Sequence, residues 1–304
     1  MTPPIAGILP VLHTPFDTSD RIDAESLRRE VDWAFEQGAN GVCAAMVSEI
    51  LRLDVEERFQ LNEMIVDFCA GRGPVVASAG AESIRQAVVF AEQAVRVGCG
   101  AVMAIPPIAA PASFAGLVTY FSAIADAVDV PLIVQDASSY VGTSMSTEFY
   151  VRPLDRYGPE KILFKPEGNP VGPGISALRD AAGGRARIFD GSGGILLIDA
   201  WRRGIAGTMP GTDLLDGVSA LWNALHRGDE EAAYQIYFPI CGIVALQMQA
   251  GLDGFLAIEK HLMVRRGLFA TDRRREPNAW SADAETLAEV DRLFDQLQAI
   301  LAVT

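Results

Sequence analysis

Lysine is scarce in this 304-residue chain, which contains three lysines: Lys161, Lys165 and Lys260. Lysine and arginine together number 25, so arginine supplies nearly all of the positive charge. Against 39 acidic residues the formal net charge is −14. A chain this acidic is a poor partner for nucleic acid or an anionic membrane surface, because both bind basic patches. Each lysine therefore needs its own explanation.

Cysteine is also rare, and the four cysteines show no CxxC spacing. They lie in apolar contexts, which indicates reduced, buried thiols in the cytoplasm rather than a disulfide framework or a zinc site. The N-terminus lacks the charged and apolar regions of a signal peptide. The longest apolar stretch, 101–118, contains three prolines and predicts a strand, a loop and a helix start rather than a membrane span.

Metal-binding patterns are missing as well. The three histidines, His13, His226 and His261, are far apart, and no HxH, HExxH or DxD spacing occurs. We therefore expect neither a metal nor another cofactor. His13 follows the first apolar run and is interpreted as a polar core residue, with a metal ligand as the alternative.

Eight short apolar runs alternate with longer amphipathic segments. The runs begin near residues 8, 41, 74, 101, 131, 162, 186 and 205. They are apolar on both faces, as buried parallel strands are. Helices are expected between them, for example at 24–37, 56–68, 83–97 and 114–128. The pattern predicts an α/β fold, a (β/α)8 TIM barrel over residues 1–225, and it favours this fold over a doubly wound open sheet.

The pattern changes after about residue 226. Residues 229–249, 254–266 and 282–302 predict helices with no strands between them. We therefore expect a C-terminal helical domain over residues 226–304. The segment 272–278, with three consecutive arginines, is interpreted as a polar linker within it.

One lysine stands where barrel enzymes carry their catalytic groups, at the C-terminal end of a strand. Lys165 directly follows the apolar run 162–164. Burial disfavours the charged form of an amine, and a neutral lysine amine can form a Schiff base with a carbonyl group. A surface position, or an ion pair with Glu167, is the alternative. Lys161 and Lys260 are interpreted as solvated surface residues.

A glycine-rich segment, Asp190-Gly-Ser-Gly-Gly, follows the seventh run. Its backbone amides could hold an anionic group at the start of the next helix. Alternatively, the glycines serve a tight turn that requires positive φ angles. The sequence leaves both interpretations open.

Ordered motifs across residues 5–220 resemble the dihydrodipicolinate synthase/N-acetylneuraminate lyase superfamily of Schiff-base aldolases. The motifs are Gly7-Ile-Leu-Pro-Val with Thr14-Pro-Phe, Ser48-Glu49 with Leu53 and Glu56-Glu-Arg, Pro131-Leu-Ile-Val-Gln-Asp with Gly142, and Phe164-Lys165. The resemblance implies a barrel with a C-terminal helical bundle, usually in homotetramers, with homodimers as an alternative. It also implies a 2-keto acid substrate such as pyruvate and makes Lys165 the Schiff-base lysine.

Three positions depart from the synthases and lyases of this superfamily. Gln135 stands where they usually carry a catalytic tyrosine, and Met46-Val47 where they carry paired threonines. Tyr140 stands where the synthases carry an arginine that binds the second carboxylate of the substrate.

Other features resemble the 2-keto-3-deoxy-L-arabonate dehydratases of the same superfamily. They are Val134-Gln-Asp-Ala, Ser48-Glu49, Lys165-x-Glu167 and the segment 204–209. The resemblance favours dehydration of a 2-keto-3-deoxy sugar acid through a lysine enamine. The alternatives are 4-hydroxy-tetrahydrodipicolinate synthase or another pyruvate-dependent aldolase and, in a different class, a catalytically silent sugar-acid sensor.

We expect catalysis to depend on Lys165, Gln135 and Glu167. A carboxamide is not a practical acid or base, so Gln135 would orient a water or a substrate hydroxyl. Glu167 would act as acid or base, with an ion-paired rim residue as the alternative. The resemblance implies that the Ser48 hydroxyl and loop amides bind the substrate carboxylate. The residues expected to bind substrate are Thr14, Val47, Ser48, Asp136, Ser192 and Met209, with a purely structural role as the alternative for Asp136.

Overall fold

Short parallel strands form the centre of the computed structural model, which describes residues 4–138, 142 and 144–303. The strands are β1 Gly7–Ile8, β2 Val11–Leu12, β3 Val42–Ala44, β4 Val75–Ser78, β5 Ala101–Ala104, β6 Leu132–Asp136, β7 Ile162–Pro166, β8 Phe189–Asp190 and β9 Gly207–Thr208. The first predicted run forms both β1 and β2, which are separated by Leu9 and Pro10. This run pairs with β9 through β1 and with β3 through β2, so it joins two sheets.

The strands close into a ring. One sheet has the order β1-β9-β8 and the other the order β2-β3-β4-β5-β6-β7, and every pairing is parallel. Backbone bridges Phe164↔Ile188 and Val11↔Gly211 connect the two sheets at both ends. The predicted (β/α)8 barrel is confirmed, and the open-sheet alternative is wrong.

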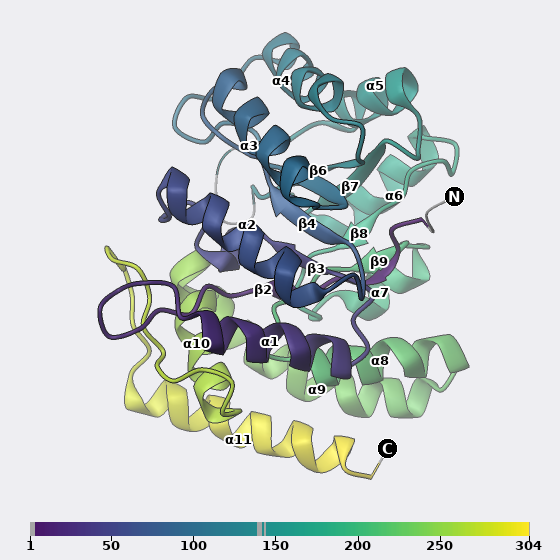
Figure 1. Cartoon of the computed structure of the whole chain (residues 1–304). Coiled ribbons are helices and arrows are strands. Elements are labelled where there is room, and N and C mark those ends of the chain that lie inside the picture. Colours follow the sequence, from purple (N-terminus) through teal and green to yellow (C-terminus); the bar gives the residue numbers. More distant parts are fainter. Residues whose placement is uncertain (1–3, 139–141, 143, 304) are drawn as a thin grey trace.

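Helices follow the strands and surround the barrel (Figure 1). They are α1 Ala24–Glu36, α2 Val55–Cys69, α3 Ile84–Val97, α4 Phe114–Ala127, α5 Thr147–Tyr157, α6 Val171–Ala181, α7 Leu197–Arg202 and α8 Leu215–Arg227, with a short 3₁₀ helix η1 at Met46–Ser48. Side chains cap several of their N-termini. Asp54 accepts the Glu57 amide while Glu57 accepts the Asp54 amide, which satisfies two backbone donors at the start of α2.

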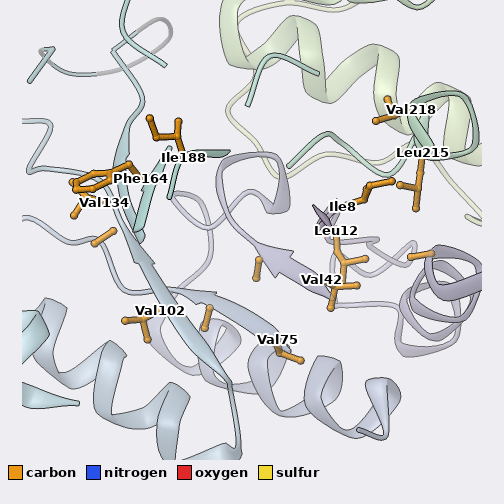
Figure 2. Packing of buried hydrophobic residues seen from close by; sticks show 14 of the residues in the cluster. Ile8, Leu12, Val42, Val75, Val102, Val134, Phe164, Ile188, Leu215 and Val218 are labelled. Carbon is orange, nitrogen blue, oxygen red and sulfur yellow. The ribbon is translucent and has the colours of Figure 1, made fainter. Parts of the chain in front are cut away.

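Alternation along the strands builds two apolar cores. Side chains such as Val42, Val102 and Phe164 point outward and pack between the barrel and its helices, where Figure 2 shows them. Their sequence neighbours point inward and fill the barrel: Cys43, Ala101, Met103, Ile133, Leu163 and Phe189. Consecutive strand residues face opposite sides, so both faces of each strand are apolar. The four cysteines are free, and all but the half-buried Cys241 are buried.

Further helices follow the barrel. They are α9 Glu230–Gln247, the 3₁₀ helix η2 Met248–Ala250, α10 Gly251–Arg265 and α11 Ala284–Leu301. Helix α9 packs against α8 and α11, and Figure 1 shows α11 at the outer edge of this layer. The predicted helical extension is present. The predicted domain boundary after residue 225 falls inside α8 and stays a prediction.

The stretch Glu230–Arg265 is long and apolar enough to cross a membrane by length and composition alone. This is weak evidence, because core helices of soluble proteins pass the same test. Three of its residues, Leu252, Phe255 and Glu259, line a pocket of the barrel. Such a position is that of a helix packed within the fold.

The predictions for two lysines and for the linker need correction. Lys260 is not solvated: it is fully buried and contacts Glu49, the Thr14 carbonyl at 2.7 Å and the Arg273 carbonyl at 2.8 Å. Lys161 is half-buried and donates to the carbonyls of Val128 and Val130. Burial of a lysine ammonium group costs much less free energy when carbonyl or carboxylate oxygens accept its hydrogen bonds.

Residues 272–278 are held in place rather than forming a loose linker. The Arg275 guanidinium forms an ion pair with Glu57 at 2.7 Å, and its backbone amide donates to Glu49 at 2.8 Å. The Arg275 side chain also lies over the Phe16 ring, 4.5 Å from its centre. This segment therefore ties the helical extension to the barrel.

Candidate active site

Strand alternation places two predicted catalytic residues inside the barrel. Gln135 and Lys165 are register partners on β6 and β7. Each follows an inward-facing residue by two positions, Ile133 and Leu163 respectively, so their side chains point to the interior as well. Both are buried, with 2% and 4% of their surfaces exposed.

Glu167 connects these two side chains. Its Oε1 lies 3.3 Å from Lys165 Nζ, and its Oε2 accepts a hydrogen bond of 2.6 Å from Gln135 Nε2. Its own backbone amide donates to the Asp136 carbonyl at 2.9 Å, which fixes the start of the loop after β7. The structure therefore brings an amine, a carboxylate and a carboxamide together. With these three groups, the amine can add to a carbonyl carbon and the neighbouring carboxylate can transfer a proton.

A small pocket, with a volume of about 40 Å³, opens onto Lys165. The barrel contributes Gln135, Val47 and Met209 to its wall, so these predicted residues do line one site. The helical extension contributes the remaining side, through Leu252, Phe255 and Glu259 of α10.

Two predicted substrate-binding hydroxyls make contacts within the protein. The Ser48 hydroxyl donates to the Leu12 carbonyl and accepts the Ala45 amide at 3.0 Å. The Thr14 hydroxyl donates to the Ser48 carbonyl at 2.6 Å. These contacts shape the loop of η1, whose residues 45–47 line the pocket.

Asp136 points away from the barrel interior. Its carboxylate accepts the amides of Ser138 and Met145 at 2.9 and 2.8 Å, and the Tyr150 hydroxyl at 3.1 Å. These contacts favour the purely structural role of Asp136 over substrate binding. Tyr140, expected to replace a carboxylate-binding arginine, lies outside the described residues.

Ser192 lies in the glycine-rich segment, beside the main pocket. Its hydroxyl donates to Asp190 at 3.0 Å and accepts the Leu196 amide at 3.0 Å. It lines a second pocket, next to the first, that Gly191 and Phe255 also line. Gly193 and Gly194 have φ angles of 68° and 105°, which supports the tight-turn interpretation.

Gly191 is essential to the geometry around Lys165. A Cβ atom at this position would overlap Glu167 Oε1 and Lys165 Cε. Gly191→Ala is therefore expected to displace the pair and to lower turnover by about 100-fold, because reacting groups must be held close to their productive geometry. Gly174→Ala is the matched control, since nothing lies within 4 Å of a Cβ there. Turnover of both variants should be measured under identical conditions, and equal turnover would contradict the prediction.

A charged cluster beside the pocket was missed by sequence reasoning. His13 lies between two carboxylates: its Nδ1 is 2.9 Å from Glu30 and its Nε2 is 2.9 Å from Glu259. Asp213 completes the cluster, with ligand atoms of His13, Asp213 and Glu259 within 4.8 Å of one another. These residues are too far apart in sequence to form a motif. A signal did exist for α10, because Leu252, Phe255 and Glu259 follow the spacing of one helical face.

The two carboxylates favour the protonated form of His13. Burial alone would lower the pKa of His13, but hydrogen bonds to Glu259 and Glu30 outweigh it and raise the pKa to about 10. The hydrogen bonds to both carboxylates therefore favour the doubly protonated ring at neutral pH. The cluster suits a buried imidazolium, and the prediction that His13 is a polar core residue agrees with its complete burial.

This cluster predicts a pH dependence of stability. A folded-state pKa raised from 6.5 to about 10 gives stabilisation that is complete below pH 6.5 and lost as the pH rises through 10. The free energy of unfolding should fall across this window by up to about 1.4 kcal/mol per pH unit through His13. Urea unfolding of the unaltered protein and of His13→Gln measures this slope. The same slope in both proteins would show that His13 is not its source.

Comparison with known proteins identifies the family. A family model described as the dihydrodipicolinate synthetase family matches residues 4–296. The chain belongs to this family. Dihydrodipicolinate synthetase family members are lyases of the class I aldolase type, so the chain is an enzyme of this type.

Individual relatives agree with this assignment. The chain is 30% identical over 288 residues to L-2-keto-3-deoxyarabonate dehydratase of Azospirillum brasilense, covering 91% of this chain and 89% of the relative. It is 28% identical over 255 residues to 4-hydroxy-tetrahydrodipicolinate synthase of Methanosarcina mazei, covering 78% and 81%. Among solved structures, dihydrodipicolinate synthase of Rhodopseudomonas palustris superposes with a TM-score of 0.87 at 25% identity, covering 98% and 99% of the two chains.

Proposed function

We propose that the enzyme dehydrates a 2-keto-3-deoxy sugar acid, such as 2-keto-3-deoxy-L-arabonate, through a Schiff base on Lys165. The observation that carries this proposal is the arrangement Lys165–Glu167–Gln135 inside the barrel. A carboxylate lies beside the amine, and a carboxamide occupies the position where the synthases have their tyrosine. The similarity to the Azospirillum dehydratase supports the same substrate class.

Lys165 begins the proposed reaction. Its neutral amine attacks C2 of the keto acid, and loss of water yields an iminium ion. The iminium withdraws electrons from C3, so a base can remove a C3 proton to form an enamine. Glu167 is the carboxylate placed for this step, 3.3 Å from Lys165 Nζ. Expulsion of the C4 hydroxyl then gives the unsaturated iminium, and hydrolysis releases the product.

Gln135 has a positioning role in this scheme. Its amide donates to Glu167 Oε2 at 2.6 Å and so directs the carboxylate toward the amine. A carboxamide does not exchange protons near neutral pH, unlike the phenol that relays protons in the synthases. This replacement disfavours the condensation of pyruvate with a second substrate and leaves elimination within one bound molecule.

The substrate carboxylate is assigned to the loop that ends β3. Residues 45–47 line the pocket, and the backbone amides of Met46 and Val47 can donate to an anion, whereas the Ala45 amide already binds Ser48. Ser48 stabilises this loop through Leu12 and Ala45, so we assign it a supporting role. The net charge of −14 repels an anionic substrate at long range, and local donors must therefore supply the attraction.

The same proposal includes a homotetramer or a homodimer, for which Phe238 on α9, 64% exposed, offers apolar surface.

Two parallel assays test the substrate class. One contains 2-keto-3-deoxyarabonate, and the other contains pyruvate with aspartate semialdehyde, the substrates of the synthase reaction. We expect turnover in the first assay and none in the second. Turnover confined to the second assay would overturn the dehydratase proposal. Binding without turnover in either assay would indicate a silent sensor instead.

A further inference from the structure

Glu259 reaches the Lys165 pocket from outside the barrel. It lies on α10 of the helical extension, whereas Lys165 and Glu167 lie at the end of β7. Only 3% of its surface is exposed, and it lines the pocket together with Lys165 and Gln135. The steps proposed for Lys165 and Glu167 do not use this carboxylate.

The two oxygens of Glu259 have different surroundings. Its Oε2 is 2.9 Å from His13 Nε2. Its Oε1 and the Asp213 Oδ1 both lie close to Gly211. A Cβ atom added to Gly211 would be 2.8 Å from Glu259 Oε1 and 2.6 Å from Asp213 Oδ1. Within the part of the chain that the structure describes, no side chain or amide donates to these two oxygens. The other Asp213 oxygen accepts Gln247 Nε2 at 2.8 Å.

The Asp213 and Glu259 carboxylates are buried within 4.8 Å of each other, and two negative charges repel strongly away from water, so protonation of one of them is favoured. Burial, followed by the charge of Glu259, raises the pKa of Asp213 to about 7. A proton is therefore exchangeable at Asp213, beside Glu259, near neutral pH, where an acid–base catalyst is most effective.

His13 and Glu30 fix the position of Glu259. Glu30, on α1, holds His13 Nδ1 at 2.9 Å, and it also accepts the His13 backbone amide at 2.9 Å. Other charged groups near the pair are Arg266, which donates to the Asp213 carbonyl at 2.8 Å, and Lys165 across the pocket. Lys260, next in sequence, binds Glu49 instead. The imidazolium thus holds one Glu259 oxygen and leaves the other for proton exchange.

We propose that Glu259 is a second acid–base residue of the pocket, which protonates the departing C4 hydroxyl with a proton held at the Glu259–Asp213 pair. This role rests on the dehydratase function proposed above. The elimination needs a base for the C3 proton and an acid for the C4 oxygen, and Glu167 serves as the base.

The electrons and protons of the step balance. The nitrogen lone pair of the enamine re-forms the C2=N bond, the C2=C3 electron pair moves to form the C3=C4 bond, and the C4–O bond breaks. The departing oxygen takes the proton from the Glu259–Asp213 pair and leaves as water. Glu167 keeps the C3 proton. Exchange with solvent then returns Glu167 and the pair to their starting states.

The test separates enamine formation from hydroxyl loss. Glu259→Gln should still be trapped by borohydride with pyruvate and should still exchange the pyruvate methyl protons in D2O, because neither process breaks a C–O bond. Its turnover of 2-keto-3-deoxyarabonate should fall by about 100- to 1,000-fold. Glu167→Gln should lose proton exchange as well. Glu231→Gln, on the exposed surface of α9, is the matched control.

The possible results decide between the proposals. Turnover of Glu259→Gln at the rate of the unaltered protein would overturn this role and leave the dehydratase proposal standing. No turnover by the unaltered protein would overturn both. If Glu259→Gln also loses borohydride trapping of pyruvate, the variant Asp213→Asn tests the proposal instead. It should keep trapping, and the pH profile of its kcat should lose the inflection near 7. Equal loss of trapping and turnover in Asp213→Asn would overturn the proposal.

Discussion

Replacement of Lys165 by alanine should abolish both turnover and borohydride trapping. No other described lysine lines the pocket, so the variant has no amine to form the iminium. The loss should be on the order of 10⁵-fold or more, the scale on which an enzyme loses a covalent nucleophile. Steady-state kinetics with 2-keto-3-deoxyarabonate and mass spectrometry after borohydride reduction with pyruvate measure the two effects.

Lys161→Ala is the matched control for this prediction. Lys161 precedes β7, and its ammonium group binds the carbonyls of Val128 and Val130. Its removal should leave the adduct in place, because it does not line the pocket. A covalent adduct retained in Lys165→Ala would overturn the assignment of the nucleophile.

Replacement of Lys260 by methionine should destabilise the fold without touching the reacting atoms. Lys260 is fully buried against Glu49 and the carbonyls of Thr14 and Arg273. Methionine fills a similar volume but removes the cation nearest to the buried Glu49 carboxylate, which keeps only the more distant Arg52 guanidinium at 3.8 Å. Breaking one side of a buried ion pair costs about 3–5 kcal/mol. For a chain of 304 residues, the thermal midpoint should then fall by roughly 5–8 °C.

The double variant Lys260→Met with Glu49→Gln tests the cause of this loss. Removing both charges should restore part of the stability, because no unpaired charge stays buried. Lys161→Met, at a half-buried site with carbonyl partners, should cost much less. An unchanged midpoint in Lys260→Met would contradict the structural role assigned to Lys260.

Strand periodicity explains why much of the fold and part of the site could be predicted. The eight apolar runs gave the strands of the barrel because a parallel strand covered on both faces is continuously apolar. The same runs gave Lys165, since a strand ends where its polar residues begin. Alternation also separates Gln135, which points inward, from Asp136, which points outward to Tyr150. Counting this alternation along β6 therefore predicts the direction of the Gln135 and Asp136 side chains.

Long-range partners explain the failures. Lys260 lies beside Glu259 on an amphipathic helix, and sequence alone does not show that α10 packs both residues against the barrel. Glu49 and Lys260 are 211 positions apart, so no local pattern links them. His13 and Glu259 are 246 positions apart. A polar residue at an inward position of an apolar helix needs a partner, but only the fold shows which one.

Peptide mapping of the borohydride-reduced enzyme tests most directly whether Lys165 forms the Schiff base. The unaltered protein is incubated with pyruvate, reduced and digested, and the modified lysine is located by tandem mass spectrometry. We expect a single pyruvate adduct, on Lys165. An adduct on Lys161 or Lys260, or none at all, would contradict it.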